Sequence, residues 1–169
     1  MKNIYLLLVF LISSFTSQAQ DEFDKFEDNE DVTTIIVSRS MFKLMSQFNS
    51  DSDPETQEYM DMIKDIDGLR VYITENQDIA GEMKDMATKY IKSSKLTELM
   101  RVKDKGANVK IYVKQGRDED HVEELLMFVS DKEDEQTIVM SLRGDIDLNK
   151  VALLTEKMNL PTGGNLEIQ

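Results

Sequence analysis

The stretch from residue 96 to 143 constrains the fold of this chain most, because its apolar side chains follow the spacing of strands. Residues 109–113 and 138–142 carry an apolar residue at every second position, which is typical of strands with one buried face. Between them, residues 125–129 read Leu-Leu-Met-Phe-Val, which indicates a central strand covered on both faces. Gly106 lies in a polar turn that its freedom to adopt a positive φ would suit. We predict a meander of four antiparallel strands over about residues 96–143.

The segments around the meander predict two more strands and four helices. Residues 32–37 are rich in β-branched side chains and residues 69–74 alternate, so both segments are expected to be strands. Apolar residues at spacings of three and four predict the helices, which begin near Ser40, at Pro54 after an Asp53 cap, near Asp78, and at Asp147 as a cap. Gly68 is expected to end the second helix.

The resulting order is strand, helix, helix, strand, helix, four strands and helix. It predicts a single α+β domain over residues 32–160, with a mainly antiparallel sheet and the helices packed on one face. The methionines on the predicted helices, in a chain with 11 Met, are expected to fill the core. The alternative is a groove for a small apolar ligand or a partner peptide.

Residues 1–19 have the features of a secretory signal peptide. Lys2 precedes a short apolar run over residues 4–12, and Ser17-Gln18-Ala19 provides the small residues that a signal peptidase accepts. The apolar run is far shorter than the roughly 20 residues of a membrane-spanning helix. We expect cleavage near Ala19 and Gln20, and an exported protein that is periplasmic or extracellular.

The remaining ends of the chain are expected to lie outside the domain. Residues 20–31 predict an acidic, loosely ordered tether whose rings, Phe23 and Phe26, could dock on the domain. Residues 161–169 are expected to form a C-terminal tail. The sequence contains no cysteine, so it predicts neither a disulfide nor a lipid-modified membrane anchor.

The charge of the chain limits its partners. The net charge is −13 and becomes −14 once Lys2 leaves with the signal peptide. Binding to nucleic acid requires clustered lysine and arginine side chains, so nucleic acid is not an expected partner, and an anionic membrane surface is disfavoured for the same reason. The acidic residues are expected to form a solvated surface; the alternative is attraction of cations or of a basic partner.

Two short patterns match catalytic motifs. Ser40-Met41-Phe42-Lys43 has the spacing of a serine nucleophile activated by a lysine, but the further motifs of such enzymes are absent from the sequence. His121 is the single histidine, and a triad or a metal site could use it. Acidic residues surround it in the sequence, so a solvated imidazole at a strand start is the simpler interpretation, as is an exposed Ser40 near a helix N-terminus.

Three pairs of aspartates have a spacing that Ca²⁺ ligands can have. These are Asp51 and Asp53, Asp65 and Asp67, and Asp145 and Asp147. None continues into a twelve-residue calcium loop that ends in glutamate, so we predict no metal site. The tripeptide Arg143-Gly144-Asp145 matches an integrin-binding motif, but a turn of the backbone at Gly144 explains it better.

The chain resembles a known family in four segments. These are residues 23–27, 99–104, 121–129 and 144–148, and they resemble the family called domain of unknown function 4252 over essentially the whole mature chain. The resemblance implies an exported protein of Bacteroidetes-type Gram-negative bacteria, often encoded near extracytoplasmic-function sigma factors. The family has no assigned active site, so the resemblance assigns no functional residue. Some relatives have the features of lipoproteins, whereas this chain lacks the cysteine.

Two functions from different classes follow from the sequence. The first is a non-catalytic exported interaction or binding module of the cell envelope, linked by the resemblance to envelope stress or sigma-factor signalling. The alternative is a hydrolase of unfamiliar type that uses carboxylates, which needs neither histidine nor cysteine. We predict no enzyme activity, no catalytic residue and no cofactor, and either a protein partner or a small apolar ligand.

Overall fold

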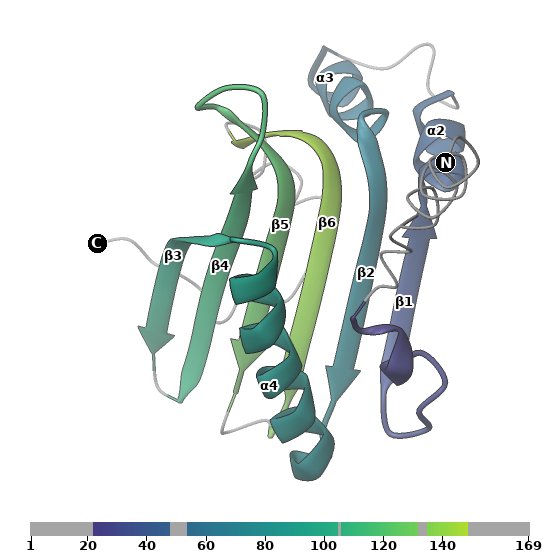
Figure 1. Ribbon diagram of the computed structural model, residues 1–169. Coiled ribbons are helices and arrows are strands. Elements are labelled where there is room, and N and C mark those ends of the chain that lie inside the picture. The colour runs from purple at the N-terminus through teal and green to yellow at the C-terminus, as the bar shows by residue number, and fades with distance from the viewer. Residues whose placement is uncertain (1–21, 48–53, 105, 132–134, 149–169) are drawn as a thin grey trace, which may run out of the picture.

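The computed structural model describes residues 22–47, 54–104, 106–131 and 135–148. These residues form one antiparallel sheet with the strand order β1-β2-β6-β5-β4-β3 (Figure 1). The strands are β1 (Thr33–Ser38), β2 (Ile66–Thr74), β3 (Thr97–Asp104), β4 (Ala107–Gln115), β5 (His121–Ser130) and β6 (Thr137–Asp147). The helices are a 3-10 turn, η1 (Asp24–Phe26), and the α-helices α2 (Arg39–Gln47), α3 (Pro54–Ile63) and α4 (Gln77–Ser93).

The predicted meander is confirmed. The strands β3 to β6 follow one another in the chain and pair with one another in the same order. Gly106 has a φ of 107° in the β3–β4 turn, as its place in the sequence predicted. The last strand is longer than expected and continues to Asp147. Leu148, directly after it, is helical, and the rest of the helix predicted to follow Asp147 lies outside the described residues.

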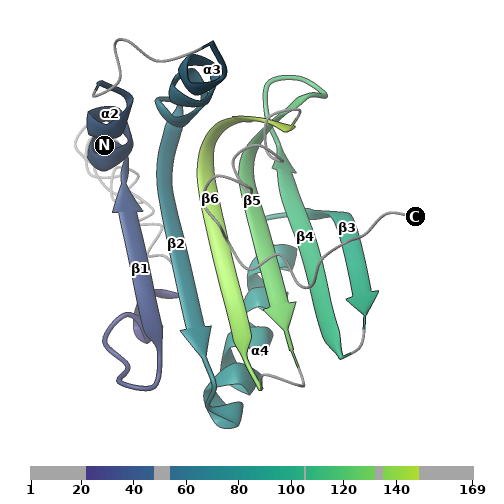
Figure 2. The same ribbon diagram turned by 180° about the vertical axis from the view of Figure 1, so that it is seen from behind.

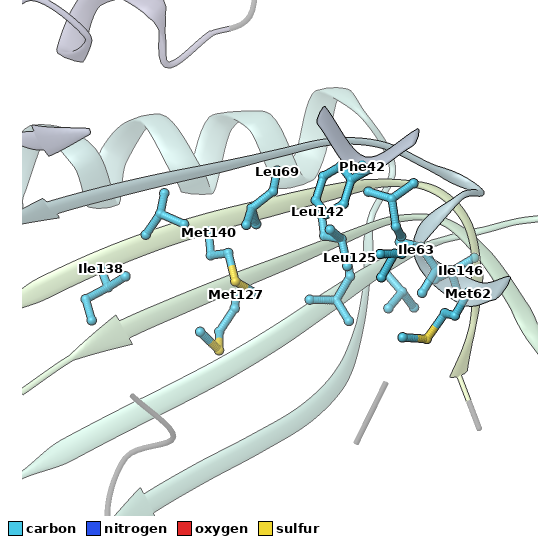
Figure 3. Close-up of a cluster of buried hydrophobic side chains, with 14 of the residues drawn as sticks. Phe42, Met62, Ile63, Leu69, Leu125, Met127, Ile138, Met140, Leu142 and Ile146 are labelled. Atoms are coloured by element: carbon cyan, nitrogen blue, oxygen red, sulfur yellow. The ribbon is translucent and has the colours of Figure 1, made fainter. Parts of the chain in front are cut away.

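One face of the sheet is covered by aliphatic and methionine side chains, which we call the aliphatic face. Alternate residues of four strands point to it, as the spacing predicted. They include Leu69, Val71, Val109, Val113, Leu125, Met127, Val129, Ile138, Met140 and Leu142. Figure 3 shows this cluster, with Phe42, Met62 and Ile63 packed at one end.

The opposite face, which we call the aromatic face, carries α4 and η1. Its cluster contains Phe23, Phe26, Tyr72, Tyr90 and Phe128. The central strand β5 contributes to both faces, with Leu126 and Phe128 here and Leu125 and Met127 on the other. The interpretation of residues 125–129 as a strand covered on both sides is therefore confirmed.

The helices are divided between the two faces. The helix α4 lies across the aromatic face, where Met83, Ala87 and Tyr90 are buried (Figure 1). Phe42 of α2 and Met62 and Ile63 of α3 instead join the cluster of the aliphatic face, at the end of β1 and β2 (Figure 2). The expectation of helices on one face thus holds for α4, whereas the chain reversal from β1 to β2 brings α2 and α3 to the other side.

The boundary between the second helix and the second strand differs from the prediction. The helix begins at Pro54, as expected, but ends at Ile63, and β2 begins at Ile66. Gly68 therefore lies within the strand, opposite Ser38 and Arg143, and does not end the helix. Ile66 is completely buried. A buried isoleucine at this position fits the end of a helix as well as the start of a strand, so the apolar spacing did not distinguish the two.

The acidic segment before β1 is packed rather than loosely ordered. Phe23 and Phe26 are each 1% exposed, and the ring of Phe23 lies 5.7 Å from the ring of Tyr72. The guanidinium of Arg70 donates to Asp24 Oδ1 at 2.7 Å and to Glu27 Oε1 at 3.2 Å. The docking of the two rings is confirmed, and this ion-pair network shows why the acidic residues do not prevent it.

The predicted signal peptide, its predicted cleavage site and the predicted C-terminal tail lie outside the described residues. Asp53, the predicted cap of α3, lies outside them as well. Within the described part of the chain, the helices are too short or too polar to cross a membrane.

Candidate functional site

The register of the sheet is interrupted at one end, at the same level in three neighbouring strand pairs. The shifts fall between Ile66 and Gly68 in the β2–β6 pair, between Val122 and Glu124 in the β5–β6 pair, and at Lys114 and Gln115 in the β4–β5 pair. One row of paired residues connects them, namely Gly68, Arg143, Glu124 and Lys114. Such bulges bend strands and redirect side chains, and β5 and β6 curve at this end (Figure 1). We refer to it as the bulged end.

Gly144 is the residue that makes this close packing of strands possible. Its φ is +150°, a value that residues with a side chain rarely adopt. A Cβ atom at this position would lie 2.8 Å from the Cα of Ile66, and the neighbouring Asp145 N–H donates to the Asp65 carbonyl at 3.1 Å. The glycine of Arg143-Gly144-Asp145 is thus explained by backbone geometry, as the sequence analysis expected.

A buried carboxylate lies at the centre of the bulged end. Glu124 is 5% exposed and points to the aromatic face, where the hydroxyl of Tyr90 lies 2.9 Å from its Oε1 and 2.8 Å from its Oε2. The hydroxyl of Ser141 donates to Oε1 at 2.9 Å. Both oxygens of this carboxylate therefore accept hydrogen bonds, as a buried charge requires.

Arg143 completes the network from the partly exposed side. Its Nη2 donates to the Tyr90 hydroxyl at 2.8 Å, and its Nε lies 3.4 Å from Glu124 Oε1. Burial, followed by the hydrogen bond to Glu124, raises the pKa of Tyr90 above its usual range. The phenol therefore stays protonated at neutral pH, accepts from the guanidinium and donates to the carboxylate.

A cleft of about 680 Å³ opens beside this network. Its lining includes Tyr90, Ser94, Lys114, Arg117, Glu124 and Arg143. Ion pairs surround it, with Lys114 Nζ 2.9 Å from Glu123, Arg117 Nη1 3.0 Å from Asp145, and Arg39 Nη2 2.6 Å from Asp67. The cleft therefore presents charges of both signs at short range.

His121 is held in place rather than solvated. It begins β5, as expected, but its side chain is only 17% exposed. Its Nδ1 lies 2.6 Å from Asp118 Oδ1 and its Nε2 lies 2.5 Å from Nη2 of Arg117. Since arginine can only donate, Nε2 accepts and Nδ1 carries the proton given to Asp118. This bond is the main cause that lowers the pKa of Asp118.

The Ser40 pattern does not form a site with the residues of the cleft. Ser40 and Lys43 are both exposed on α2, and neither lines the cleft. A serine nucleophile requires a base and donors for the developing oxyanion around it. The simpler interpretation, an exposed serine in the first turn of a helix, agrees with this position.

One aspartate pair, Asp145 and Asp147, and one member of another pair, Asp65, lie in a smaller hollow of about 400 Å³. Asp65, Asp145 and Asp147 line it together with Asp61, but so do Lys64, Arg117 and His121. In the described ranges, no group of three or more Asp, Glu, His or Cys side chains is arranged to hold a metal ion. Asp51 and Asp53 lie outside those ranges.

The sequence pattern did not predict the network of Tyr90, Glu124 and Arg143. A signal was present for Glu124, because it continues the alternation of Leu126 and Phe128 toward a covered face. Tyr90 is buried on α4, and a buried tyrosine needs a partner for its hydroxyl. The identity of that partner could not be inferred, since it is 34 positions away in the sequence.

The comparisons with known proteins give a family and nothing more specific. The model of a domain of unknown function, DUF4252, matches residues 26–154. The matched range includes the whole bulged end and most of the described residues. The curated proteins and the solved structures yield no match.

Proposed function

Because the chain belongs to the DUF4252 family, whose function is unknown, we propose its role from the site: a non-catalytic, exported binding module of the cell envelope that holds a partner at the bulged end. Its place in envelope stress or sigma-factor signalling is part of this proposal and rests on the family association stated above. The signal-peptide features of residues 1–19 support export.

The observation that carries the proposal is the saturation of Glu124. A general acid or base must exchange a proton with a substrate, but both oxygens of Glu124 already accept hydrogen bonds. The other carboxylates that line the cleft are Asp67, Glu123 and Asp145, which are 52%, 58% and 44% exposed and paired with cations. This arrangement supports binding over the alternative of a carboxylate-dependent hydrolase, which needs two converging acids.

The cleft suits a partner segment that carries charges of both signs. Lys114 and Arg117 are each about half exposed, and exposed ion pairs contribute only about 0–1 kcal/mol. Their exchange for ion pairs with a partner therefore costs little. Arg143 is fixed by Tyr90 and Glu124, so it offers a guanidinium of set orientation at the base of the cleft. A protein segment fits these features better than an apolar ligand.

Site-specific photo-crosslinking in the producing bacterium tests the proposal. A photoreactive residue at Lys114, on the rim of the cleft, should give a defined adduct with an envelope protein. The same residue at Lys84, exposed on α4, is the matched control and should give none. Equal adduct patterns at both positions would contradict the proposal, as would hydrolase turnover by the purified protein that Glu124→Gln abolishes.

Export is tested separately. Replacing Leu7 and Leu8 with arginine interrupts the apolar run that the translocon reads, so the unprocessed precursor should accumulate in the cytoplasm. The measurement is fractionation of the cells followed by N-terminal sequencing. Continued export of the double variant would show that residues 1–19 do not act as the signal.

A further inference from the structure

The two edges of the sheet differ in how they are protected against pairing with another strand. The edge strand β3 carries Glu98, Arg101, Lys103 and Asp104, and its register shifts between Glu98 and Met100. Charges and bulges of this kind block edge-to-edge pairing. The edge strand β1 reads Thr-Thr-Ile-Ile-Val-Ser, without a charge or a proline, and its six residues pair with β2 without a register shift.

Exposed apolar side chains gather at β1. Six large apolar residues are exposed in the described part of the chain, and four of them, Ile35, Ile36, Met41 and Leu44, belong to β1 and the helix that follows it. Ile35 and Ile36 are 46% and 48% exposed and point to opposite faces, because Ile35 is paired with Val71 and Ile36 with Arg70. The strand therefore offers apolar contact above and below a backbone edge that pairs with no other strand of the described residues.

The charge of β1 and of the segment that follows it in the sequence is also unlike that of the rest of the chain. Residues 32–50 contain Arg39 and Lys43 but no acidic residue, in a chain of net charge −13. Repulsion between two strongly acidic molecules is smallest where neither presents a carboxylate. Pairing of two copies through β1 therefore brings no carboxylate of this strand against another, and the nearby Asp67, Asp24 and Glu27 are paired with Arg39 and Arg70.

We propose that β1 is a self-association edge, which pairs antiparallel with β1 of a second copy to form one continuous sheet. A two-fold axis perpendicular to the sheet keeps every residue on its own face. One residue of β1 must therefore lie opposite the same residue of the second copy. If the pairing is centred on Ile35 or on Ile36, that isoleucine lies opposite the same isoleucine of the second copy. Either register covers both exposed side chains. The resulting interface is isologous and closes as a dimer.

The absence of cysteine from the chain allows a direct test. The variants Ile35→Cys and Ile36→Cys are each purified in the form that the producing cell accumulates. Each variant is then oxidised under mild conditions. At least one of them should form a disulfide-linked dimer rapidly. Leu99→Cys on β3, where Leu99 is 51% exposed, is the matched control and should remain monomeric on a denaturing gel.

Sedimentation of the cysteine-free protein provides a second, independent measurement. The wild type should have the mass of a dimer, Ile36→Lys that of a monomer with an unchanged circular dichroism spectrum, and Leu99→Lys that of a dimer. A monomeric wild type at high concentration, or cross-linking through Leu99→Cys as fast as through both β1 positions, would overturn the proposal. A mass that grows without limit would also overturn it, because it would indicate open β1–β3 pairing.

Discussion

The two faces of the sheet are buried by different chemistry. The aliphatic face consists of Val, Ile, Leu and Met side chains, with Phe42 as its single aromatic residue among those described. The aromatic face combines rings with polar atoms, since Tyr72 and Tyr90 place hydroxyl groups on Glu27 and Glu124. The packing of the aliphatic face depends only on the volume of its side chains. The packing of the aromatic face also requires that hydrogen-bonding partners come together.

This difference explains where the candidate site lies. An apolar cluster tolerates rearrangement as long as its volume is filled, but a buried carboxylate needs all of its donors in place. Glu124 lies on the aromatic face at the bulged end, where the backbone departs from regular pairing. The packing of one face thus depends on side-chain volume and that of the other also on hydrogen-bond geometry, and the following predictions test that contrast.

The largest effect is expected for Phe23→Ala. The ring of Phe23 is 1% exposed and contacts three other rings, those of Phe26, Tyr72 and Tyr90. Truncation of a buried phenylalanine costs about 3–5 kcal/mol of unfolding free energy, measured by denaturant melts. Phe42→Ala on the aliphatic face is the matched control and should cost about 0.5–1.5 kcal/mol less, because no aromatic pair is lost. A greater loss for Phe42→Ala would contradict the contrast.

The second largest effect is expected for Glu124→Ala, which should lose about 3 kcal/mol of unfolding free energy. Removal of one partner of a buried ion pair is strongly destabilising, and here it removes the acceptor of the Tyr90 and Ser141 hydroxyls and a carboxylate beside Arg143. Glu123→Ala, next to it on the exposed side of the strand, should change stability by less than about 1 kcal/mol. Similar losses for both variants would mean that the network around Glu124 does not stabilise the fold.

Tyr90→Phe should cost about 1–3 kcal/mol and change the response to alkaline pH. It removes a donor from the buried Glu124. Because the folded state raises the pKa of Tyr90 above the ordinary value of 10.0, its contribution is complete below pH 10 and is lost as the pH rises toward the folded pKa. The stability of each protein is expressed relative to its own stability at neutral pH. On that scale, alkaline unfolding of the variant should begin at a higher pH than that of the wild type.

Tyr112→Phe is the control for that measurement. The pKa of Tyr112 is also raised, mainly by burial, but its side chain is only partly buried and lies outside the Glu124 network. Linkage predicts a change of its alkaline profile in the same direction as for Tyr90→Phe, but a smaller one, because the Tyr112 side chain is less buried. Identical shifts for the two variants would assign the effect to tyrosines in general rather than to the buried network.

The smallest effect is expected for Met140→Leu on the aliphatic face. Met140 is 6% exposed among aliphatic neighbours, and an exchange that nearly conserves volume costs less than about 1.5 kcal/mol. Tyr90→Phe conserves volume equally well but removes a hydrogen bond. A larger loss for Met140→Leu than for Tyr90→Phe, in the same denaturant melts, would show that volume matters more than polar geometry on both faces.

The sequence by itself determined that six strands form, the faces to which the alternating residues of the meander point, and the helix α4. Alternation over residues 109–113 and 138–142 is a local property of the chain, and the order in which the meander strands pair follows from short connections. The same reasoning failed between Ile63 and Gly68, because a buried Ile66 fits a helix and a strand equally well. It also missed how firmly Phe23 and Phe26 are packed, since Arg70, which pairs with the neighbouring Asp24 and Glu27, lies more than 40 positions away.

Only the tertiary structure decided the candidate site. The bulges at Gly68, Glu124 and Gly144 arise where four strands adjust to one another, and no local pattern encodes that adjustment. Tyr90 and Arg143 meet across 53 positions of sequence because one lies on a helix and the other on the strand beneath it. Spacing along a chain specifies which face a side chain occupies, but the register between distant strands determines which side chains it contacts there.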